Sequence, residues 1–473
     1  MENKRINGND LIALGYKENH AMGVALKINK KRLGYSREQM LDKFRDVLHN
    51  PESYLDDKIF HPLAEVLLKI DTIERETVAL KDAPDSYTVY GAEHIEEGAK
   101  KQMQVAMKLP VTVAGALMPD AHQGYGLPIG GVLATDNAVI PYGVGVDIGC
   151  RMALSVFDLP DSYIAAHHDK LKKVLMDNTR FGAGNGYQRH ERVDHPVLDN
   201  ELFKTHGFIR SLKDKAWTQL GSSGGGNHFV EFGIIEFAAG DDALGVGRGQ
   251  YLALLTHSGS RGLGATIAGH YTKLAKEICK LPYEAQNLAY LDLNTAEGQE
   301  YWLAMNLAGD YASACHEVIH DKIRTALGAG LLAKVENHHN FAWKEQFDGE
   351  EVIVHRKGAT PASRGTMGII PGSMATPGFL VRGKGEEASI NSASHGAGRL
   401  MSRTQAIKTL SPTALKTMLS DYGITLLGAG MDEAPMAYKD IHTVMSAQSD
   451  LVDVVATFVP KIVRMADDGS RED

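Results

Sequence analysis

The sequence predicts an α+β fold with a helical segment at its N-terminus, and two observations support this prediction. Over residues 98–466, strand-like and helix-like segments alternate in a mixed order, without an internal repeat and without the regular rhythm of a doubly wound sheet. Over residues 9–81, apolar residues recur at helical spacing instead. We therefore expect an N-terminal helical accessory segment over residues 1–85 and one large domain of mixed β-sheets flanked by helices over residues 95–466.

The positions of the expected elements follow from the spacing of apolar residues. Near the N-terminus, Leu41, Phe44 and Val47 share one face of a helix, and the helical pattern lapses over Lys81–Glu97, where we expect a linker. Beyond the linker, the patterns predict strands over Val111–Met118, Met152–Leu159, Phe229–Ile235 and Tyr251–Thr256, and helices over Ile164–Asn178 and Glu297–Leu327.

The composition is that of a globular protein whose cysteines are expected to be reduced. Of 473 residues, 43% are hydrophobic and 23% are charged, and neither a signal peptide nor an apolar run of membrane-spanning length is present. Cys150, Cys279 and Cys315 cannot form a disulfide framework, so we expect a cytoplasmic protein. Because no apolar run is long enough to span a membrane, we also expect that the protein does not enter one. A net charge of −9 argues against nonspecific nucleic-acid binding over the whole surface but leaves room for a local basic groove.

The most informative stretch is Pro119–Cys150, where acids, a histidine and a cysteine lie among glycines. A predicted strand delivers Asp120 and His122 into a first glycine-rich loop, and a second loop presents Asp147 and Cys150 three residues apart. An Asp-x-x-Cys pair can bind one metal, or the cysteine can bridge two. The alternative is a tight loop with an inert, buried cysteine.

Two further blocks place a histidine beside a strand and a glycine-rich turn. In residues 221–231 a glycine run, whose backbone amides suit phosphate oxygens, leads into Asn227, His228 and Glu231. After the strand Tyr251–Thr256, His257 precedes a turn and Arg261 begins a helix, which would hold a metal beside a phosphate. The alternatives are a hairpin loop with an incidental histidine and a capped strand–helix turn.

By residue type, these blocks supply a metal-binding set. Its members are Asp147, Cys150, His228, His257 and one of His338 and His339. Carboxylate, thiolate and imidazole ligands fit Zn²⁺, Mn²⁺, Fe²⁺ or Co²⁺ rather than Ca²⁺ or Mg²⁺. The set exceeds the needs of one tetrahedral ion, so two metals that share the Cys150 thiolate are an economical hypothesis, and two metals around a phosphate suit phosphoryl chemistry.

Two other motifs carry alternatives of their own. His316, Glu317 and His320 form an H-E-x-x-H pattern, which in zinc peptidases places two imidazoles on one helical face, although a chance match is easily found among 20 histidines. Further on, His395 precedes glycines, and Arg399 and Arg403 lie four residues apart. On a helix the two arginines would stack on one face and suit a row of phosphates, or form a solvated face.

Taken together and in this order, the motifs resemble the RtcB family of RNA ligases. The resemblance spans Met118–Asp440, and the matching stretches are MPDAHQGYGLPIGG, GVGVDIGC, GGGNHFVE, THSGSRGLG, HHN, RKGA, IIPGSM, SHGAGRLMSR and DEAPMAYKDI. It implies an RtcB-like fold with a single large catalytic domain. It also implies that RNA ends with a 2′,3′-cyclic phosphate or 3′-phosphate are joined to 5′-hydroxyl ends, in RNA repair or tRNA splicing, with GTP and Mn²⁺ and through a covalent histidine–GMP intermediate.

The resemblance also implies roles for individual residues. It assigns His395 as the nucleophile and Asp120 as the carboxylate that orients its imidazole. The ligands of two Mn²⁺ ions, with Cys150 bridging, would be Asp147, Cys150, His228, His257 and His339, the last preferred over His338 because Asn340 follows it. Nucleotide contacts would come from Asn227, Phe229, Glu231, Asn340, Gly372, Ser373, Met374, Ala397, Gly398 and Tyr438. RNA phosphates would meet Arg261, Lys357, Arg399 and Arg403.

The chain departs from the family pattern in a few places. Gln123 replaces the usual proline or leucine, Gly378 stands about where a serine touches the nucleotide, and the last residues lack the usual Lys-Gly whose lysine reaches the guanine. The N-terminal helices have no counterpart in the common short form. These departures leave open an enzyme that hydrolyses cyclic phosphate or nucleotidylates 3′ ends without sealing them, with an altered nucleotide preference. A zinc peptidase and a non-catalytic RNA-end binder are two further candidate functions.

Overall fold

The computed structural model describes residues 6–16, 20–30, 34–71 and 77–467, and the chain forms two compact units, Met1–Glu76 and Thr77–Asp473. The first unit is helical, as its periodicity predicts. It contains α1 (Gly8–Ala13), α2 (His20–Asn29), α3 (Arg37–His49), the 3₁₀ helix η1 (Pro51–Tyr54) and α4 (His61–Asp71). Asn7 and Ser36 cap α1 and α3 through their side chains, and fully buried Leu11, Phe44 and Leu63 lie in the core of the unit.

The second unit contains a five-stranded sheet that carries the Asp120 loop. Its order is β1 (Thr88–Val89), β2 (Thr112–His122), β3 (Ile129–Thr135), β11 (Glu350–Lys357) and β10 (Asn340–Phe347). The linker expected over Lys81–Glu97 is in fact part of this unit, because β1 pairs in parallel with β2 at Ala116 and Leu117.

A larger, eight-stranded sheet carries most of the histidine blocks. Its order is β13 (Met367–Ile370), β14 (Gly378–Gly383), β17 (Val452–Met465), β6 (Phe229–Phe237), β7 (Gly249–Ser258), β5 (Arg151–Pro160) and β9 (Leu331–His338), and β16 (Thr425–Leu426) pairs with β17. The two ends of this order meet, because Oδ1 of Asn337 in β9 accepts the backbone N–H of Ile369 in β13 at 2.9 Å. The sheet is therefore nearly closed.

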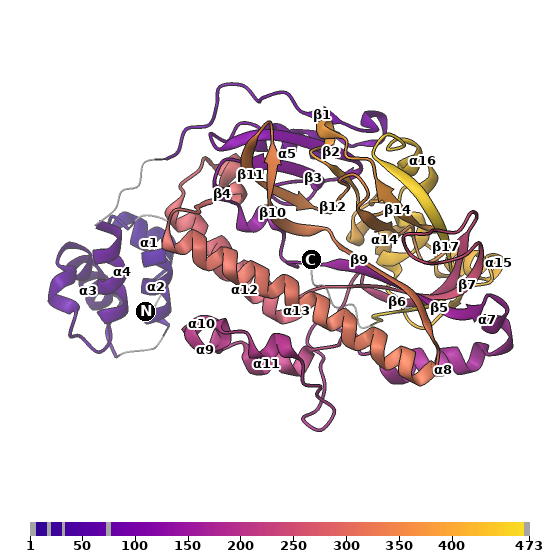
Figure 1. Ribbon diagram of the computed structural model, residues 1–473. Coiled ribbons are helices and arrows are strands. Elements are labelled where there is room, and N and C mark those ends of the chain that lie inside the picture. Colours follow the sequence, from indigo (N-terminus) through magenta and orange to yellow (C-terminus); the bar gives the residue numbers. More distant parts are fainter. Residues whose placement is uncertain (1–5, 17–19, 31–33, 72–76, 468–473) are drawn as a thin grey trace. The chain divides into compact units, whose positions relative to one another are not determined.

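The two faces of this sheet have separate cores, which the alternation of β7 illustrates. Ala253 and Leu255 pack inward with Met152 of β5 and Phe458 of β17, whereas Leu252 and Leu254 pack outward. The outward cluster includes residues of α8 (His168–Asn178) and α13 (Ala296–Leu327), which cover this face (Figure 1). Strand periodicity thus decides which side chains of β7 face the interior of the sheet and which face α13.

Helix α13, the longest in the described structure, packs along α12 (Arg261–Ile278) (Figure 1). Thr295 caps its N-terminus, and Gly328 ends it with a φ of +67°. The remaining helices are α5 (Glu97–Ala106), α6 (Pro141–Val144), α7 (Ser162–Ala166), α9 (Leu202–Thr205), α10 (Gly207–Arg210), α11 (Lys213–Gln219), α14 (Arg403–Thr409), α15 (Pro412–Asp421) and α16 (Ile441–Ser446). The short strands β4 (Ala138–Val139) and β8 (Leu291–Asp292) pair, as do β12 (Ala359–Pro361) and β15 (Ser392–Ser394). Further 3₁₀ helices are η2 (Ala92–His94), η3 (Pro196–Asp199), η4 (Tyr283–Leu288), η5 (Glu387–Ser389), η6 (Met431–Glu433) and η7 (Pro435–Ala437).

The predicted α+β class is confirmed, and the differences are local. The helix expected over Ile164–Asn178 is two helices, α7 and α8, which meet at His167, whose φ and ψ (−130° and 27°) are not helical. Arg399 and Arg403 do not share a helix, because Ser402 caps α14 and the helix begins only at Arg403. None of the described helices is both long and apolar enough to cross a bilayer.

Candidate metal centre and active site

The cysteine loop is held by a close approach of two backbones. Gly149 has a φ of +71°, and a Cβ added there would lie 2.8 Å from the Cα of Gly309 in α13. A side chain at residue 149 would therefore clash with the helix, so glycine is required. Cys150 follows Gly149 directly and precedes β5, which begins at Arg151. Cys150 is buried, with only 3% of its surface exposed.

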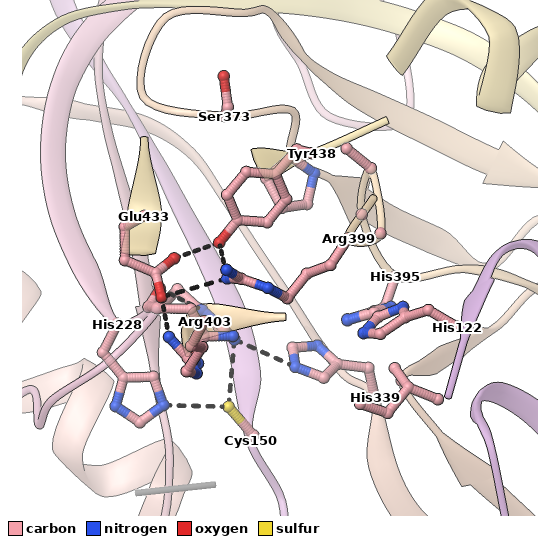
Figure 2. A pocket seen from close by; sticks show the side chains of 18 of the residues that line it. His122, Cys150, His228, His339, Ser373, His395, Arg399, Arg403, Glu433 and Tyr438 are labelled. Atoms are coloured by element: carbon pink, nitrogen blue, oxygen red, sulfur yellow. Dashed lines mark hydrogen bonds and ion pairs between the residues drawn. The ribbon is translucent and has the colours of Figure 1, made fainter. Parts of the chain in front are cut away.

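The sulfur of Cys150 lies among the imidazoles that the sequence groups with it. It is 3.4 Å from Nε2 of His228 and 3.2 Å from Nε2 of His257, and Figure 2 shows it facing the His228 ring. Nε2 of His228 is also 3.1 Å from Oδ2 of Asp147, and Nε2 of His257 is 3.2 Å from Nε2 of His339. Four blocks distant in sequence thus meet at one thiol.

Backbone carbonyls fix the orientation of two of these imidazoles. Nδ1 of His228 lies 2.9 Å from the carbonyl oxygen of Ser223, and Nδ1 of His257 lies 3.0 Å from that of Asn227. If each Nδ1 carries the proton and donates it, each Nε2 presents its lone pair toward the thiol. This arrangement is common among histidines that ligate metals.

The ligand atoms form two overlapping triads that share Cys150. One triad is Asp147, Cys150 and His228, the other is Cys150, His257 and His339, and all five residues are buried. Ligand atoms around one tetrahedral ion are separated by about 3.3–3.7 Å, given metal–ligand bonds of roughly 2.0–2.3 Å. The observed separations come close to this range, so the donor set fits two divalent cations bridged by the thiolate.

The pKa values of three of these side chains are compatible with metal ligation. Burial, with neighbouring His228, lowers the pKa of His257 to about 3, and burial holds the pKa of His339 well below its usual range. Both imidazoles are therefore neutral at pH 7 and able to ligate. Burial, reinforced by Asp147, raises the pKa of the Cys150 thiol to about 12, and a bound divalent cation would displace that proton.

His338, the open alternative to His339, has a different environment. Its ring lies 4.9 Å from the rings of Phe341 and Trp343, and burial lowers its pKa to about 3. His339, not His338, belongs to the Cys150 triad. His338 is the last residue of β9, whereas His339 lies in the bend that follows, where its backbone N–H donates to the carbonyl oxygen of Cys150 at 3.0 Å.

A fourth histidine lies beside the three of the cluster and is held by a buried carboxylate. Oδ2 of Asp120 lies 2.7 Å from Nδ1 of His395 and accepts its backbone N–H at 3.1 Å. Burial alone would raise the pKa of Asp120, but His395 and Lys439 outweigh burial and lower it. An ionised Asp120 fixes the proton on Nδ1, so Nε2 of His395 carries the lone pair. The His395 ring is centred 5.0 Å from that of His339 (Figure 2).

One cavity of about 740 Å³ brings together nearly all the residues singled out from the sequence, and its size is that of a site for a nucleotide-sized ligand. Its walls include the five cluster residues and His395. All ten residues expected to contact nucleotide line it as well: Asn227, Phe229, Glu231, Asn340, Gly372, Ser373, Met374, Ala397, Gly398 and Tyr438. Asp120 lies directly behind His395 and is fully buried.

Of the four expected phosphate contacts, Arg261 lies outside the cavity. It is 2% exposed, Nε donates to Ser222 Oγ at 3.0 Å, and Nη2 donates to the carbonyl oxygen of Gly182 at 2.8 Å. Its guanidinium thus braces the glycine loop around residues 221–226. This placement does not support the expected contact with RNA, and the physical reason is that the donors are already engaged inside the protein.

Arg399 and Arg403 line the cavity and converge on a carboxylate that the sequence analysis did not single out. Glu433 is 3% exposed and pairs with both guanidinium groups and with the Tyr438 hydroxyl (Figure 2). Arg403 also pairs with Asp432 at 3.0 Å. The two acids belong to the stretch DEAPMAYKDI, so the charges in that block were the available signal.

Lys357 is the one lysine in the described part of the cavity wall. Burial lowers its pKa to about 7, and Nζ donates to the carbonyl oxygen of Tyr125 at 2.5 Å. Nζ also lies 5.0 Å from the centre of the Tyr142 ring. The Lys357 side chain is therefore buried in the cavity wall, with its Nζ near two tyrosines.

The H-E-x-x-H motif has no geometry for a zinc peptidase. Thr256 Oγ1 lies 2.6 Å from Nδ1 of His316 and 2.8 Å from Nε2 of His320, and both imidazoles are buried in hydrogen bonds. Glu317 faces outward and pairs with His195 at 3.1 Å. Within the described residues, neither imidazole belongs to a metal-binding triad. The motif joins α13 to β7, and the peptidase alternative is wrong.

The fold and the cavity define a class of protein in which a buried Asp/Cys/His cluster that could hold metal ions lies beside an oriented histidine. The family described as "tRNA-splicing ligase RtcB" matches residues 102–466. The chain is 34% identical over 414 residues to the RNA-splicing ligase RtcB of Escherichia coli K12, which covers 81% of this chain and 97% of that protein. The protein belongs to the RtcB family.

Relatives from two further organisms show the same relationship. The tRNA-splicing ligase RtcB of Thermococcus kodakarensis is 29% identical over 426 residues, which cover 75% of this chain and 88% of that protein. The RNA-splicing ligase RtcB of Mycobacterium tuberculosis is 30% identical over 426 residues, which cover 76% of this chain and 98% of that protein. The N-terminal helical unit Met1–Glu76 lies before the range matched to the family.

Proposed function

We propose that the protein is a GTP- and Mn²⁺-dependent RNA ligase that joins RNA ends bearing a 2′,3′-cyclic phosphate or 3′-phosphate to 5′-hydroxyl ends. One observation carries the proposal: His395, with its proton directed to Asp120, shares a cavity with two overlapping metal-binding triads. Membership of a family whose named relatives are RNA-splicing ligases agrees with it. The physiological setting would be RNA repair or tRNA splicing in the cytoplasm.

The residues suit a nucleotidyl transfer to His395. The lone pair on its Nε2 attacks the α-phosphorus of GTP, an N–P bond forms, and the bond to the pyrophosphate oxygen breaks, while Asp120 holds the proton on Nδ1. Where the RNA ends in a 2′,3′-cyclic phosphate, water first opens the ring by breaking the bond between phosphorus and the 2′ oxygen. An oxygen of the RNA 3′-phosphate then attacks the phosphorus of the bound GMP, and the N–P bond to His395 breaks. Finally, the RNA 5′-hydroxyl attacks the activated 3′-phosphate and GMP leaves.

Other residues of the cavity bind and orient the substrates. Asp147, Cys150, His228, His257 and His339 would hold two Mn²⁺ ions, which absorb the negative charge of the phosphates when bound. Lys357, Arg399 and Arg403 are the cationic side chains in the cavity for RNA phosphates. Because Glu433 already pairs with both arginines, a phosphate would compete with that carboxylate for their donors.

The test is incubation with Mn²⁺ and GTP labelled at the α-phosphate. We expect a covalent protein adduct in the wild type and none in His395→Ala, and ligated product when RNA ends with 3′-phosphate and 5′-hydroxyl groups are added. The matched control His195→Ala changes a histidine that pairs with Glu317 outside the cavity and should label normally. Labelling that persists in His395→Ala would overturn the proposal, as would unlabelled wild-type protein that still ligates RNA.

A second candidate is transfer to RNA ends without sealing, or with a nucleotide other than GTP. The cavity wall contains the apolar side chains of Met374, Val463 and Met465. These side chains offer a base no hydrogen bonds and so do not select guanine, which favours this second candidate. Glu231 also lines the cavity, and burial raises the pKa of its carboxyl group well above the usual range. The same labelling with each of the four nucleotides, followed by product analysis, separates this candidate from the ligase.

A further inference from the structure

A shallower groove adjoins the cavity on the side of α12. It is lined by Tyr142 and Val146, by residues of α12 that include Lys273 and Lys276, and by Lys280, which follows the end of that helix. Tyr142 and Val146 line the cavity as well. The two hollows therefore share a wall, and a polymer that leaves the cavity past Tyr142 enters the groove.

The groove is positively charged, although the chain as a whole has a net charge of −9. Lys273 and Lys280 are exposed, and Lys276 is half-buried with Nζ donating to Asn287 Oδ1 at 2.6 Å. The groove also contains Glu277, which lies 3.8 Å from Lys273 and offsets one of the three charges. Lys273 and Lys276 lie about one turn apart on α12, and Lys280 follows two residues after the end of the helix, so the three ammonium groups line one groove and suit the phosphates of one strand.

Tyrosines connect the cavity to this row of lysines. The Tyr142 ring has Lys357 Nζ from the cavity at 5.0 Å and Lys276 Nζ from the groove at 5.9 Å. Tyr125 lies 6.5 Å from Tyr142, centre to centre, and is 70% exposed, the second-highest exposure among the large hydrophobic residues described. Exposed rings beside ammonium groups form surfaces on which unpaired bases stack while their phosphates are neutralised.

We propose that Tyr125, Tyr142 and the lysines at 273, 276 and 280 bind the single-stranded part of the RNA substrate as it leaves the cavity. This inference rests on the proposed function, because it assumes that the polymer in the cavity is RNA. It extends the binding surface from the cavity wall, where Tyr125 and Tyr142 lie, to the lysines of the groove, and it gives this group of lysines a role in a protein of net negative charge.

The test compares two double variants that carry the same charge change. Lys273→Glu with Lys280→Glu alters the groove, and Lys170→Glu with Lys173→Glu alters α8, outside both hollows. The pairs are matched, because Lys173 pairs with Asp177 four residues later, as Lys273 does with Glu277. We expect the groove variant to bind a short single-stranded RNA with a 5′-hydroxyl end about tenfold more weakly in fluorescence anisotropy, and the α8 variant to bind like wild type.

Salt dependence and aromatic substitution give independent measurements. The neutral double variant Lys273→Gln with Lys280→Gln should reduce the slope of log K against log salt by about 1.4, the value for two phosphate contacts on a single strand. Tyr125→Ala should weaken binding by at least about fivefold, and Tyr125→Phe, which keeps the ring, should bind like wild type.

The outcomes separate this inference from the proposed function. If wild-type protein forms the GMP adduct but the groove variants bind RNA like wild type, or the α8 variant loses as much affinity, the inference is wrong and the proposed function stands. Equal weakening for poly-glutamate and for RNA would also overturn it, because the groove would then be a general polyanion surface. If the adduct never forms but the groove variants bind RNA weakly, the proposed function fails and the RNA-binding groove remains.

Discussion

Two buried histidine clusters lie on opposite sides of the same strand, and they differ in what their nitrogens face. In β7, Thr256 points to α13 and holds His316 and His320, whereas His257 points to the cavity and meets the Cys150 thiol. Around Thr256 the described ring nitrogens are hydrogen-bonded to hydroxyl or carbonyl oxygens. Around Cys150 the Nε2 atoms face a sulfur, a carboxylate or one another.

This difference shows that the facing atoms, not the spacing of histidines, decide whether a cluster can hold a metal. A hydroxyl or carbonyl oxygen satisfies the hydrogen-bonding nitrogens of a neutral imidazole, so no lone pair is left for a metal ion. An imidazole lone pair directed at a thiol or at a second imidazole is a poor hydrogen-bonding arrangement and a good ligand set. The comparison can be tested by removing one residue from each cluster.

The largest expected effect is that of Cys150→Ser, which removes the shared ligand. We expect loss of both metals and a fall in ligation of about 10³-fold or more, because both triads contain this sulfur. Metal content by mass spectrometry and single-turnover ligation measure the two effects. Cys279→Ala changes another buried cysteine, in the core near α12, and should keep the full metal content. Two bound ions in Cys150→Ser would show that the thiolate does not bridge them.

The next largest effect is on the free energy of unfolding. It compares two residues of the H-E-x-x-H motif, buried His320 and half-exposed Glu317, which serves as the control. His320→Ala should lower the free energy of unfolding by about 3 kcal/mol, because it leaves a cavity and removes the imidazole beside Ser155 and Thr256. Glu317→Ala should change it by less than about 0.5 kcal/mol, since this pair with His195 is half exposed. Urea denaturation measures both, and metal content should be unchanged in both variants. Loss of metal from folded His320→Ala protein would contradict the purely structural role of this histidine.

The smallest expected effect is a pH dependence that comes from outside both clusters. With a pKa of about 7, Lys357 is a cation at pH 6 and neutral at pH 8, so affinity for RNA phosphates should fall over this interval by about threefold to tenfold. Lys357→Arg keeps its charge throughout and should flatten the profile. Anisotropy titrations at both pH values measure the change, and an equally steep profile in the arginine variant would assign the titration to another group.

The sequence predicted the cavity better than it predicted the contacts between charged side chains. The proposed ligands Asp147, Cys150, His228 and His257 each lie at a strand end or in a glycine-rich turn, and such positions are recognisable locally. The α+β class followed in the same way from the mixed order of elements. His339 could be preferred to His338 only by resemblance, and the structure supplies the reason, because the chain bends after β9 and turns His339, not His338, toward Cys150.

Pairings between distant charges could not be predicted, because they depend on the packing of loops. Glu433 reaches Arg399 and Arg403 across about thirty residues of sequence, and nothing near the arginines indicates it. Arg261 shows the opposite case: a helix N-terminus next to a metal ligand is a reasonable place for phosphate binding, yet the guanidinium turns inward to Ser222 and Gly182. The spacing of the H-E-x-x-H motif says nothing about the hydroxyl of Thr256 that lies against it.

The contact between Gly149 and Gly309 means that the backbone of the long helix α13 sets the position of the loop that carries Asp147 and Cys150, with no side chain in between. Backbone against backbone cannot relax by changing a rotamer, so even one added methyl group at residue 149 would shift the sulfur of Cys150 relative to its partners. The dimensions of the reaction centre are thereby tied to a helix that contributes no ligand to it.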